Sequence, residues 1–232
     1  MNIEKYSQIA PQYYSEEIPS ILKKYLEKKE FTTILDCGCG DGSLLYSLNK
    51  ARYFDDKKVL AMDLSKNRIE LVKKIAGNII ANVDSAEDMK TINDNSIDFF
   101  MSTRVIEHVD DRKMVEKIIK KVKIGGTIYI STVFKKWYGW YFYRNGKKWV
   151  LDPTHLREYS SDRQLLNLFD KNKFKLLEEK KHLQWFPVSD FFVKRMGLGN
   201  RKLYENKIMR MLRKIRIPIF GYYNWEIVLE KI

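Results

Sequence analysis

Cysteine is scarce in this sequence of 232 residues, which contains only Cys37 and Cys39. The two lie too close together in the chain for an ordinary disulfide, and two cysteines cannot complete a tetrahedral zinc site. The chain also lacks an uncharged apolar run of the ~20 residues that a membrane-spanning helix needs. Its first residues, MNIEKYSQIAPQYY, carry charges where a secretory signal would be apolar. We therefore expect a cytoplasmic protein in a reducing compartment.

Internal repeats, low-complexity segments and the phosphate-binding pattern G-x-x-x-x-G-K-[ST] are absent as well, which excludes a Walker-type NTPase. What the chain has in excess is positive charge, a net +13 at pH 7. That charge favours anionic partners such as nucleic acid, phosphorylated small molecules or acidic lipids. Because the lysines are spread over the whole chain, general solubility explains the excess equally well.

Apolar strand patterns alternate with amphipathic helix patterns in the first part of the chain. This βαβ order predicts a parallel, doubly wound α/β sheet with helices on both faces. Two later strand patterns break the order, and we expect them to close the sheet as a C-terminal antiparallel pair within a single domain, 1–232. The expected strands are 31–37, 58–64, 78–83, 96–103, 126–133, 174–185 and 222–232, and the expected helices are 42–49, 65–76 and 110–122.

A dense cluster of glycines, in ILDCGCGDGSLL (34–45), directly follows the first apolar run. Glycines allow a sharp turn and the close approach of a ligand, and the next helix offers unsatisfied N–H groups at its start. The spacing G-x-G-x-G differs from the dinucleotide pattern G-x-G-x-x-G. Asp36 and Asp41 flank the turn and would repel a pyrophosphate, whereas they suit a cationic ligand with an ammonium and a sulfonium group.

Two further carboxylates follow the second and third expected strands. Asp63 stands about 20 residues past the glycines, where a carboxylate can bind both ribose hydroxyls. Asp84, followed by Ser85, can accept a hydrogen bond from an adenine amino group. Each aspartate alone is also a common cap or turn residue. Their placement at the ends of successive strands of one sheet favours cofactor binding.

Five motifs in register resemble class I S-adenosylmethionine-dependent methyltransferases of the type 11/12 group: ILDCGCGDGSLL, VLAMDLS, NVDSAEDM, SIDFFMSTRVIEHV and VKIGGTIYIST. The resemblance covers residues 5–185 and implies S-adenosylmethionine as the cofactor, on a Rossmann-like, mostly parallel seven-stranded sheet. It assigns the methionine end of the cofactor to Asp36, Gly38, Cys39, Gly40 and Asp41, the ribose to Asp63 and Leu64, the adenine to Asp84 and Ser85, the pocket wall to Thr103, and the N-terminal lid to Tyr13 or Tyr14.

Two histidines are candidate bases for a hydroxyl acceptor, which ionises poorly near neutral pH. His108 and His155 follow strands at the carboxyl edge of the expected sheet, and a structural hydrogen bond is the alternative role for each. Ubiquinone-type O-methyltransferases share the EHV stretch at Glu107 but carry another glutamate three residues earlier, and that set can bind a divalent ion. This sequence has Arg104 there, so we predict no metal.

Two segments outside these motifs combine apolar and basic residues. The acceptor-side segment 134–160 opens with eight aromatics and five Lys/Arg in 134–149. These rings can stack on bases or sugars, lie at a membrane interface, or pack as a lid helix. The expected insertion 186–221 contains a basic amphipathic helix that Pro218 should end. Two interpretations of residues 201–217 stay open. The segment binds an anionic membrane surface or a phosphorylated carrier, or it covers its own domain and turns a basic face to solvent.

These features predict a methyltransferase that acts on the oxygen of a small or lipid-linked, negatively charged acceptor. The resemblance suggests a sugar or glycan intermediate, or a quinone-like phenol, as that acceptor. An RNA or other nucleic-acid methyltransferase is one alternative, and a non-catalytic S-adenosylmethionine-binding regulatory protein is another. The sequence does not determine the oligomeric state.

Overall fold

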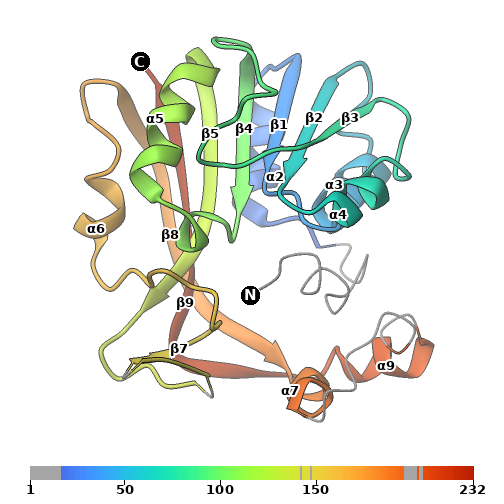
Figure 1. Cartoon of the computed structure of the whole chain (residues 1–232), viewed down its shortest axis with the longest axis vertical. Helices are drawn as coiled ribbons and strands as arrows, with labels where there is room; N and C mark the ends of the chain where they lie inside the picture. Colours follow the sequence, from blue (N-terminus) through green and yellow to red (C-terminus); the bar gives the residue numbers. More distant parts are fainter. Residues whose placement is uncertain (1–16, 142, 147, 196–202, 204–205) are drawn as a thin grey trace.

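A computed structural model describes residues 17–141, 143–146, 148–195, 203 and 206–232 of the chain. Its main sheet has seven strands in the order β3-β2-β1-β4-β5-β9-β8 (Figure 1). β3, β2, β1, β4 and β5 run parallel, and β9 pairs antiparallel with both β5 and β8. This order confirms the predicted doubly wound sheet and its antiparallel closing pair. The strands of the sheet are β1 (Thr33–Cys37), β2 (Lys58–Asp63), β3 (Ile79–Val83), β4 (Ile97–Thr103), β5 (Val122–Lys135), β8 (Phe174–Pro187) and β9 (Arg216–Lys231).

Side-chain caps fix where two helices around the sheet begin. Ser65 Oγ accepts a hydrogen bond from Arg68 N at the start of α4, as predicted, and Asp110 caps α5 by accepting from Arg112 N and Lys113 N. Among the described residues, no helix is both long and apolar enough to cross a membrane. The helices are α2 (Ser20–Lys28), α3 (Ser43–Lys50), α4 (Lys66–Val72), the 3₁₀ turn η1 (Ile106–His108), α5 (Asp111–Lys121), α6 (Asp162–Leu166), α7 (Val188–Arg195) and α9 (Lys207–Leu212).

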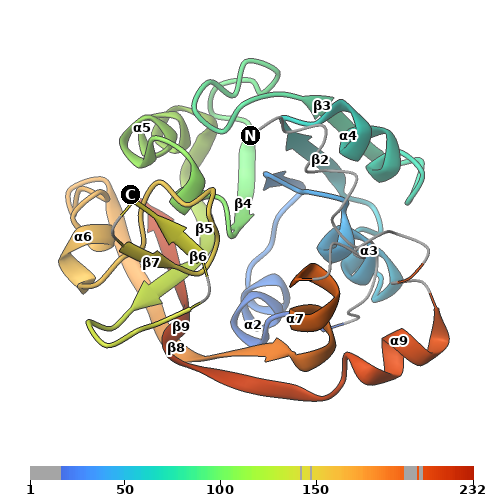
Figure 2. The ribbon, with the colours of Figure 1, turned by 60° about the horizontal axis from the view of Figure 1, so that its bottom comes forward.

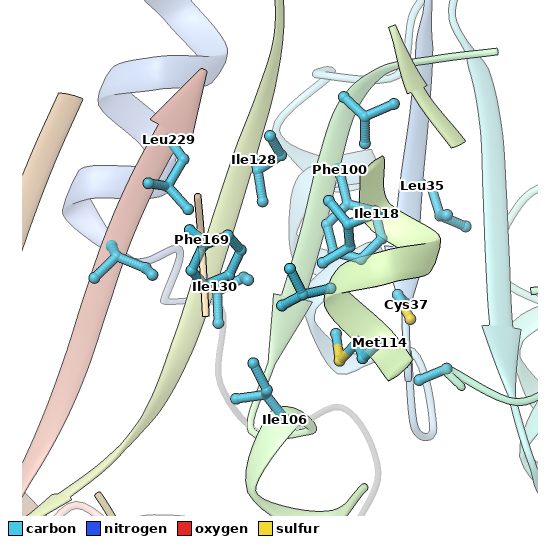
Figure 3. Packing of buried hydrophobic residues seen from close by; sticks show 14 of the residues in the cluster. Leu35, Cys37, Phe100, Ile106, Met114, Ile118, Ile128, Ile130, Phe169 and Leu229 are labelled. Atoms are coloured by element: carbon cyan, nitrogen blue, oxygen red, sulfur yellow. The ribbon is translucent and has the colours of Figure 1, made fainter. Parts of the chain in front are cut away.

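Successive residues of each strand point to opposite faces of the sheet, and each face has its own hydrophobic core. In β1, Ile34 joins the core formed with α2, α3 and α4, whereas Leu35 joins the core formed with Ile118 of α5 and with Phe169 (Figure 3). Strands buried on both faces are apolar almost without interruption. That continuity is why the parallel strands can be located from the sequence.

The ends of β5, β8 and β9 continue beyond the parallel strands as an arm, which we define as the described part of residues 134–151 and 184–222. Pairing between β5 and β9 reaches Lys135 and Tyr222, and pairing between β8 and β9 reaches Pro187 and Arg216. The β6–β7 hairpin (Tyr143–Asn145 and Lys148–Val150), α7 and α9 complete the arm (Figures 1 and 2). It lies beyond the carboxyl ends of the parallel strands (Figure 1).

Two expectations for the arm were wrong. The described part of 134–160 forms no lid helix over the aromatic residues, because β5 continues through Lys135 and the hairpin follows. Pro218 does not end a helix, since α9 already ends at Leu212 and Pro218 lies inside β9. A proline is tolerated there because β5 pairs with β9 only from Tyr222 onward, so β9 has a free edge at Pro218.

We expect Tyr129→Phe to lower the free energy of unfolding by about 1–3 kcal/mol, measured by chemical denaturation. The Tyr129 hydroxyl donates to Glu226 Oε1 at 2.7 Å and both side chains are buried, so the variant deprives a buried carboxylate of a donor. Tyr53→Phe is the matched control, because it removes an exposed hydrogen bond to Glu27 and should change stability by less than about 0.5 kcal/mol. Equal losses in the two variants would contradict the role given to the buried pair.

Candidate functional site

The turn after β1 depends on glycine at two positions. Gly38 and Gly40 have φ values of +77° and +55°, in the left-handed region that side chains disfavour. A Cβ at Gly38 would lie 2.3 Å from Cγ2 of Val105, whereas a Cβ at Gly40 would meet nothing within 4 Å. The turn therefore touches the loop after β4 on one side and leaves its backbone accessible to a ligand on the other.

Asp36 lies at the end of β1 with only 1% of its surface exposed. Its Oδ1 has no hydrogen-bond partner among the described residues. Burial, together with the nearby negative charge of Asp63, raises the pKa of Asp36 to about 7. A buried carboxyl oxygen without a hydrogen-bond partner is unfavourable for folding. Its presence in this turn points to a ligand that brings positive charge or a hydrogen-bond donor.

Asp63, at the end of β2, stabilises the glycine turn by hydrogen bonding. Its Oδ2 accepts a hydrogen bond from Gly40 N at 3.1 Å, and its Oδ1 accepts one from Ser65 N at 2.9 Å. Arg68 of α4, which sequence reasoning missed, places Nη1 3.7 Å from Asp63 Oδ2 and Nε 3.4 Å from Asp41 Oδ1. Nothing in the local sequence distinguishes that arginine from other helix cations. The ribose-binding role of Asp63 stays a prediction.

Asp84, after β3, is held by its own loop. Its Oδ1 accepts from Ser85 N, and its Oδ2 accepts from both N and Oγ1 of Thr91, each at 2.7 Å. Burial alone would raise the pKa of Asp84, but the hydrogen bonds from Thr91 and Ser85 hold it below its ordinary value. The adenine contact stays a prediction. Of the other predicted cofactor residues, Cys39 is buried, Thr103 is half-buried, Leu64 is exposed, and Tyr13 and Tyr14 lie outside the described residues.

Two loops far apart in the sequence bring His108 and His155 together. His108 is in η1, which follows β4, and the loop 152–158 lies beside it because Leu156 N donates to Glu107 O at 2.9 Å. The two imidazole rings meet edge to face, with their centroids 4.7 Å apart. The two predicted histidines are thus in contact, close in the chain to Val105, the residue that lies against the glycine turn.

Hydrogen bonds fix which ring nitrogen of each histidine carries the proton. Thr154 Oγ1 donates to Asp152 Oδ1 at 2.6 Å, so it accepts from Nδ1–H of His108 at 2.9 Å. His155 Nδ1 lies 2.9 Å from Glu158 Oε1, and a carboxylate can only accept. Each neutral ring therefore carries its lone pair on Nε2. Burial lowers the pKa of His108, which favours its neutral form. Sequence reasoning missed Glu158, although its place three residues after His155 was an available signal.

Glu107 is fully buried beside the two histidines. Its Oε2 accepts from Thr132 Oγ1 at 2.8 Å, and its Oε1 lies 4.0 Å from Nη1 of Arg104. One ligand atom each from Glu107, His108 and His155 lie within 4.8 Å of one another, which is close enough to hold a metal ion. The Arg104 guanidinium competes for the same carboxylate. The absence of a metal therefore stays a prediction.

The chain is similar to known methyltransferases. A family model described as "Methyltransferase domain" matches residues 35–130. The mitochondrial ubiquinone biosynthesis O-methyltransferase of Dictyostelium discoideum is 28% identical over 170 residues, which are 65% of this chain and 52% of that protein. The chain spans about half the length of the curated relatives it matches.

Two solved structures share the fold. The YcgJ protein from Bacillus subtilis gives a TM-score of 0.61 at 18% identity, covering 91% of this chain and 97% of that chain. Geranyl diphosphate C-methyltransferase from Streptomyces coelicolor, solved with Mg²⁺, geranyl diphosphate and S-adenosyl-L-homocysteine, gives 0.60 at 15% identity, covering 92% and 77%. The likeness confirms the predicted Rossmann-like sheet.

We expect Asp36→Asn to stabilise the ligand-free protein above neutral pH. Because the pKa of Asp36 rises from 3.8 to about 7, folding takes up a proton between those pH values, and wild-type stability falls as the pH rises through that window. The uncharged variant should be a few kcal/mol more stable than wild type near pH 8 and should equal it near pH 4, because each pH unit inside the window changes wild-type stability by roughly 1.4 kcal/mol. Urea denaturation across this range measures the difference. A variant less stable than wild type at every pH would contradict the assignment.

Proposed function

We propose that the chain carries a class I S-adenosylmethionine-dependent methyltransferase domain and that it methylates a hydroxyl oxygen of a small or lipid-linked, negatively charged acceptor. The observation that carries the proposal is the buried pair of His155 and Glu158, which lies in one cluster with His108. Such a pair can remove a proton from a hydroxyl group. A hydroxyl acceptor requires this step, whereas an acceptor that is already ionised does not.

The residues of the turn after β1 fit the cofactor of this domain. When bound, S-adenosylmethionine supplies an electrophilic methyl group on a positively charged sulfur. The unpartnered Oδ1 of Asp36 suits a cation, and the open backbone at Gly40 leaves space for it. We assign the methionine end to these residues, the ribose to Asp63 and the adenine to Asp84. A bound cation would favour the ionised form of Asp36, which burial alone disfavours.

His155 is proposed to receive the acceptor proton on Nε2, while Glu158 orients the ring. The bond from Nδ1–H to Glu158 selects the tautomer with its lone pair on Nε2, and the carboxylate stabilises the imidazolium that forms. Leu151 N donates to the same carboxylate at 2.6 Å, and Lys135 Nζ lies 3.5 Å from its other oxygen. These contacts hold Glu158 in place, so it acts as a positioning residue.

Positive charge near the histidines supports an anionic acceptor. The Arg104 side chain is 31% exposed, contacts Glu107 and donates to Gln184 Oε1 on the arm. A guanidinium in this place can bind a phosphate or carboxylate group with two parallel hydrogen bonds. The relatives named ubiquinone biosynthesis O-methyltransferase support oxygen as the methylated atom. Both a quinone-like phenol and a sugar or glycan intermediate meet these requirements.

Transfer of a labelled methyl group into cell extract, followed by partition among organic, aqueous and nucleic-acid fractions, tests the proposal. We expect label in a small molecule or lipid of the aqueous or organic fraction, held as an ether that mild base does not cleave. Label in nucleic acid would replace the proposal with an RNA or DNA methyltransferase. No transfer, together with measurable binding of S-adenosylhomocysteine, would favour a regulatory protein.

His155→Gln should lower kcat by about 10²-fold or more, because it removes the proton acceptor. Affinity for S-adenosylhomocysteine, measured by calorimetry, should not change. Glu158→Gln should lower kcat less and shift the pH–rate profile, since the ring loses its carboxylate partner. His182→Gln alters an exposed histidine on β8 and is the matched control. If kcat survives His155→Gln, the base is another group.

Chelation with EDTA should leave kcat unchanged, because the Arg104 guanidinium already lies beside Glu107 and lowers the affinity of the cluster for a cation. Turnover is measured before chelation, after chelation and after adding Mg²⁺ or Zn²⁺. Loss of activity that a divalent ion restores in wild type, but not in Glu107→Gln, would show that Glu107, His108 and His155 bind a metal.

A further inference from the structure

Apolar side chains that folded proteins usually bury are exposed along the arm. They come from the end of β5, from β8 and β9, and from the segment of α9, which together form the outer part of the chain at this end of the molecule (Figures 1 and 2). The exposed fractions are Trp137 92%, Phe220 72%, Ile208 66%, Met211 62%, Ile215 61% and Trp185 50%. Large apolar side chains that are exposed together on one part of a fold point to an interaction site.

The apolar stripe of the α9 segment, which we define as Ile208, Met211 and Ile215, faces away from the protein. Arg213, directly after the helix, turns inward to Asp190 of α7, with Nε 2.9 Å from Oδ1. At about 100° per residue, Met211 lies on the opposite side of the helix from Arg213. Ile215, which follows the helix, is 61% exposed. No residue of α9 is buried. The described residues of the domain therefore leave this stripe exposed, in contrast to what a cover helix would show.

Basic residues are frequent in the sequence segments that form the arm. Residues 134–151 contain five Lys/Arg and no Asp/Glu, and residues 191–218 contain nine Lys/Arg and one Glu. In and next to α9, Lys207, Arg210 and Lys214 are exposed and lie along one flank of the apolar stripe. The arm thus combines an apolar face with a strongly positive one.

We propose that the arm docks the protein on the surface of an anionic lipid bilayer. Interfacial segments use this combination, because tryptophan and aliphatic side chains enter the boundary below the headgroups while Lys and Arg attract anionic lipids. A second copy of the chain would bring the same positive charge to the contact, which opposes self-association. Nucleic acid would match the charge but would give no reason for an exposed stripe of Ile208, Met211 and Ile215.

The inner side of the arm contacts the candidate site. Gln184 accepts a hydrogen bond from Arg104, and Lys135 pairs with Glu158. Through these two contacts the arm connects the proposed bilayer surface to the loops that carry the two histidines. The docking surface therefore favours a lipid-linked acceptor among the candidates, a step that rests on the proposed function.

Co-sedimentation of the full chain with phosphatidylglycerol vesicles and with phosphatidylcholine vesicles tests the docking without cofactor or acceptor. We expect binding to the anionic vesicles that weakens as salt increases, and little binding to the neutral ones. Ile215→Glu should weaken the binding by at least about tenfold, because it puts a charge into the apolar face. Ile124→Glu makes the same change at a 78%-exposed residue at the far end of β5 and should bind as wild type does.

A second pair of variants tests the basic flank. Lys207→Gln/Arg210→Gln should weaken binding to anionic vesicles by about 30-fold, the loss expected for two basic contacts with an anionic surface. Lys171→Gln/Lys175→Gln removes the same charge from exposed positions at the far end of β8 and should have no effect.

The outcomes separate the docking from its competitors and from the proposed function. No binding of wild type to anionic vesicles, or equal binding by Ile215→Glu and Ile124→Glu, overturns the docking surface. The docking surface is also overturned if wild type does not bind vesicles but forms a dimer or an RNA complex that Ile215→Glu disrupts and Ile124→Glu does not. S-adenosylhomocysteine binding with no vesicle binding leaves the proposed function standing. Vesicle binding with no methyl transfer would contradict the proposed function and would support the docking surface.

Discussion

The contact between the bare backbone at Gly38 and the side chain of Val105 is the constraint on which the site depends. An added Cβ would lie 2.3 Å from Val105, and the positive φ at this position already disfavours a side chain. A larger residue would push the loop after β4 away from the turn after β1. That loop carries Glu107 and His108, so one missing side chain keeps two parts of the proposed site in contact. We call the glycine turn with Asp36 and Asp63 the cofactor half, and the loops with Glu107, His108 and His155 the acceptor half.

Both halves of the site keep buried carboxylates with incomplete partners. In the cofactor half, Asp36 has an unpartnered oxygen and a raised pKa, and in the acceptor half, Oε1 of Glu107 has no hydrogen bond from the described residues. Each half also contains an arginine, Arg68 or Arg104, near the carboxylates. Such groups lower the stability of the ligand-free protein. Their presence in a folded protein indicates that they bind ligands or exchange protons. Stability and binding are therefore opposed at the same residues.

The ends of the long antiparallel strands, which form the arm, have two sides with different contacts. Their inner side orders the acceptor half, because Gln184 bonds to Arg104 and Lys135 pairs with Glu158. Their outer side exposes aromatic, aliphatic and basic side chains, of which Trp137 is the most exposed. The same strands thus connect the chemistry of the histidines to the proposed bilayer contact.

The sequence alone determined the parallel sheet and the edge of that sheet at which the glycines and aspartates gather. Strands buried on both faces read as apolar runs, and the turn glycines and aspartates directly follow their strands, so local spacing was enough. Only the tertiary structure decided the rest. Arg68 and Thr132 acquire their roles from partners in other elements, and Pro218 is tolerated in β9 only because β5 pairs with β9 no further than Tyr222. The exposure of the α9 stripe was likewise undecidable from its pattern, since a helical period shows that one face is apolar and not which way that face points.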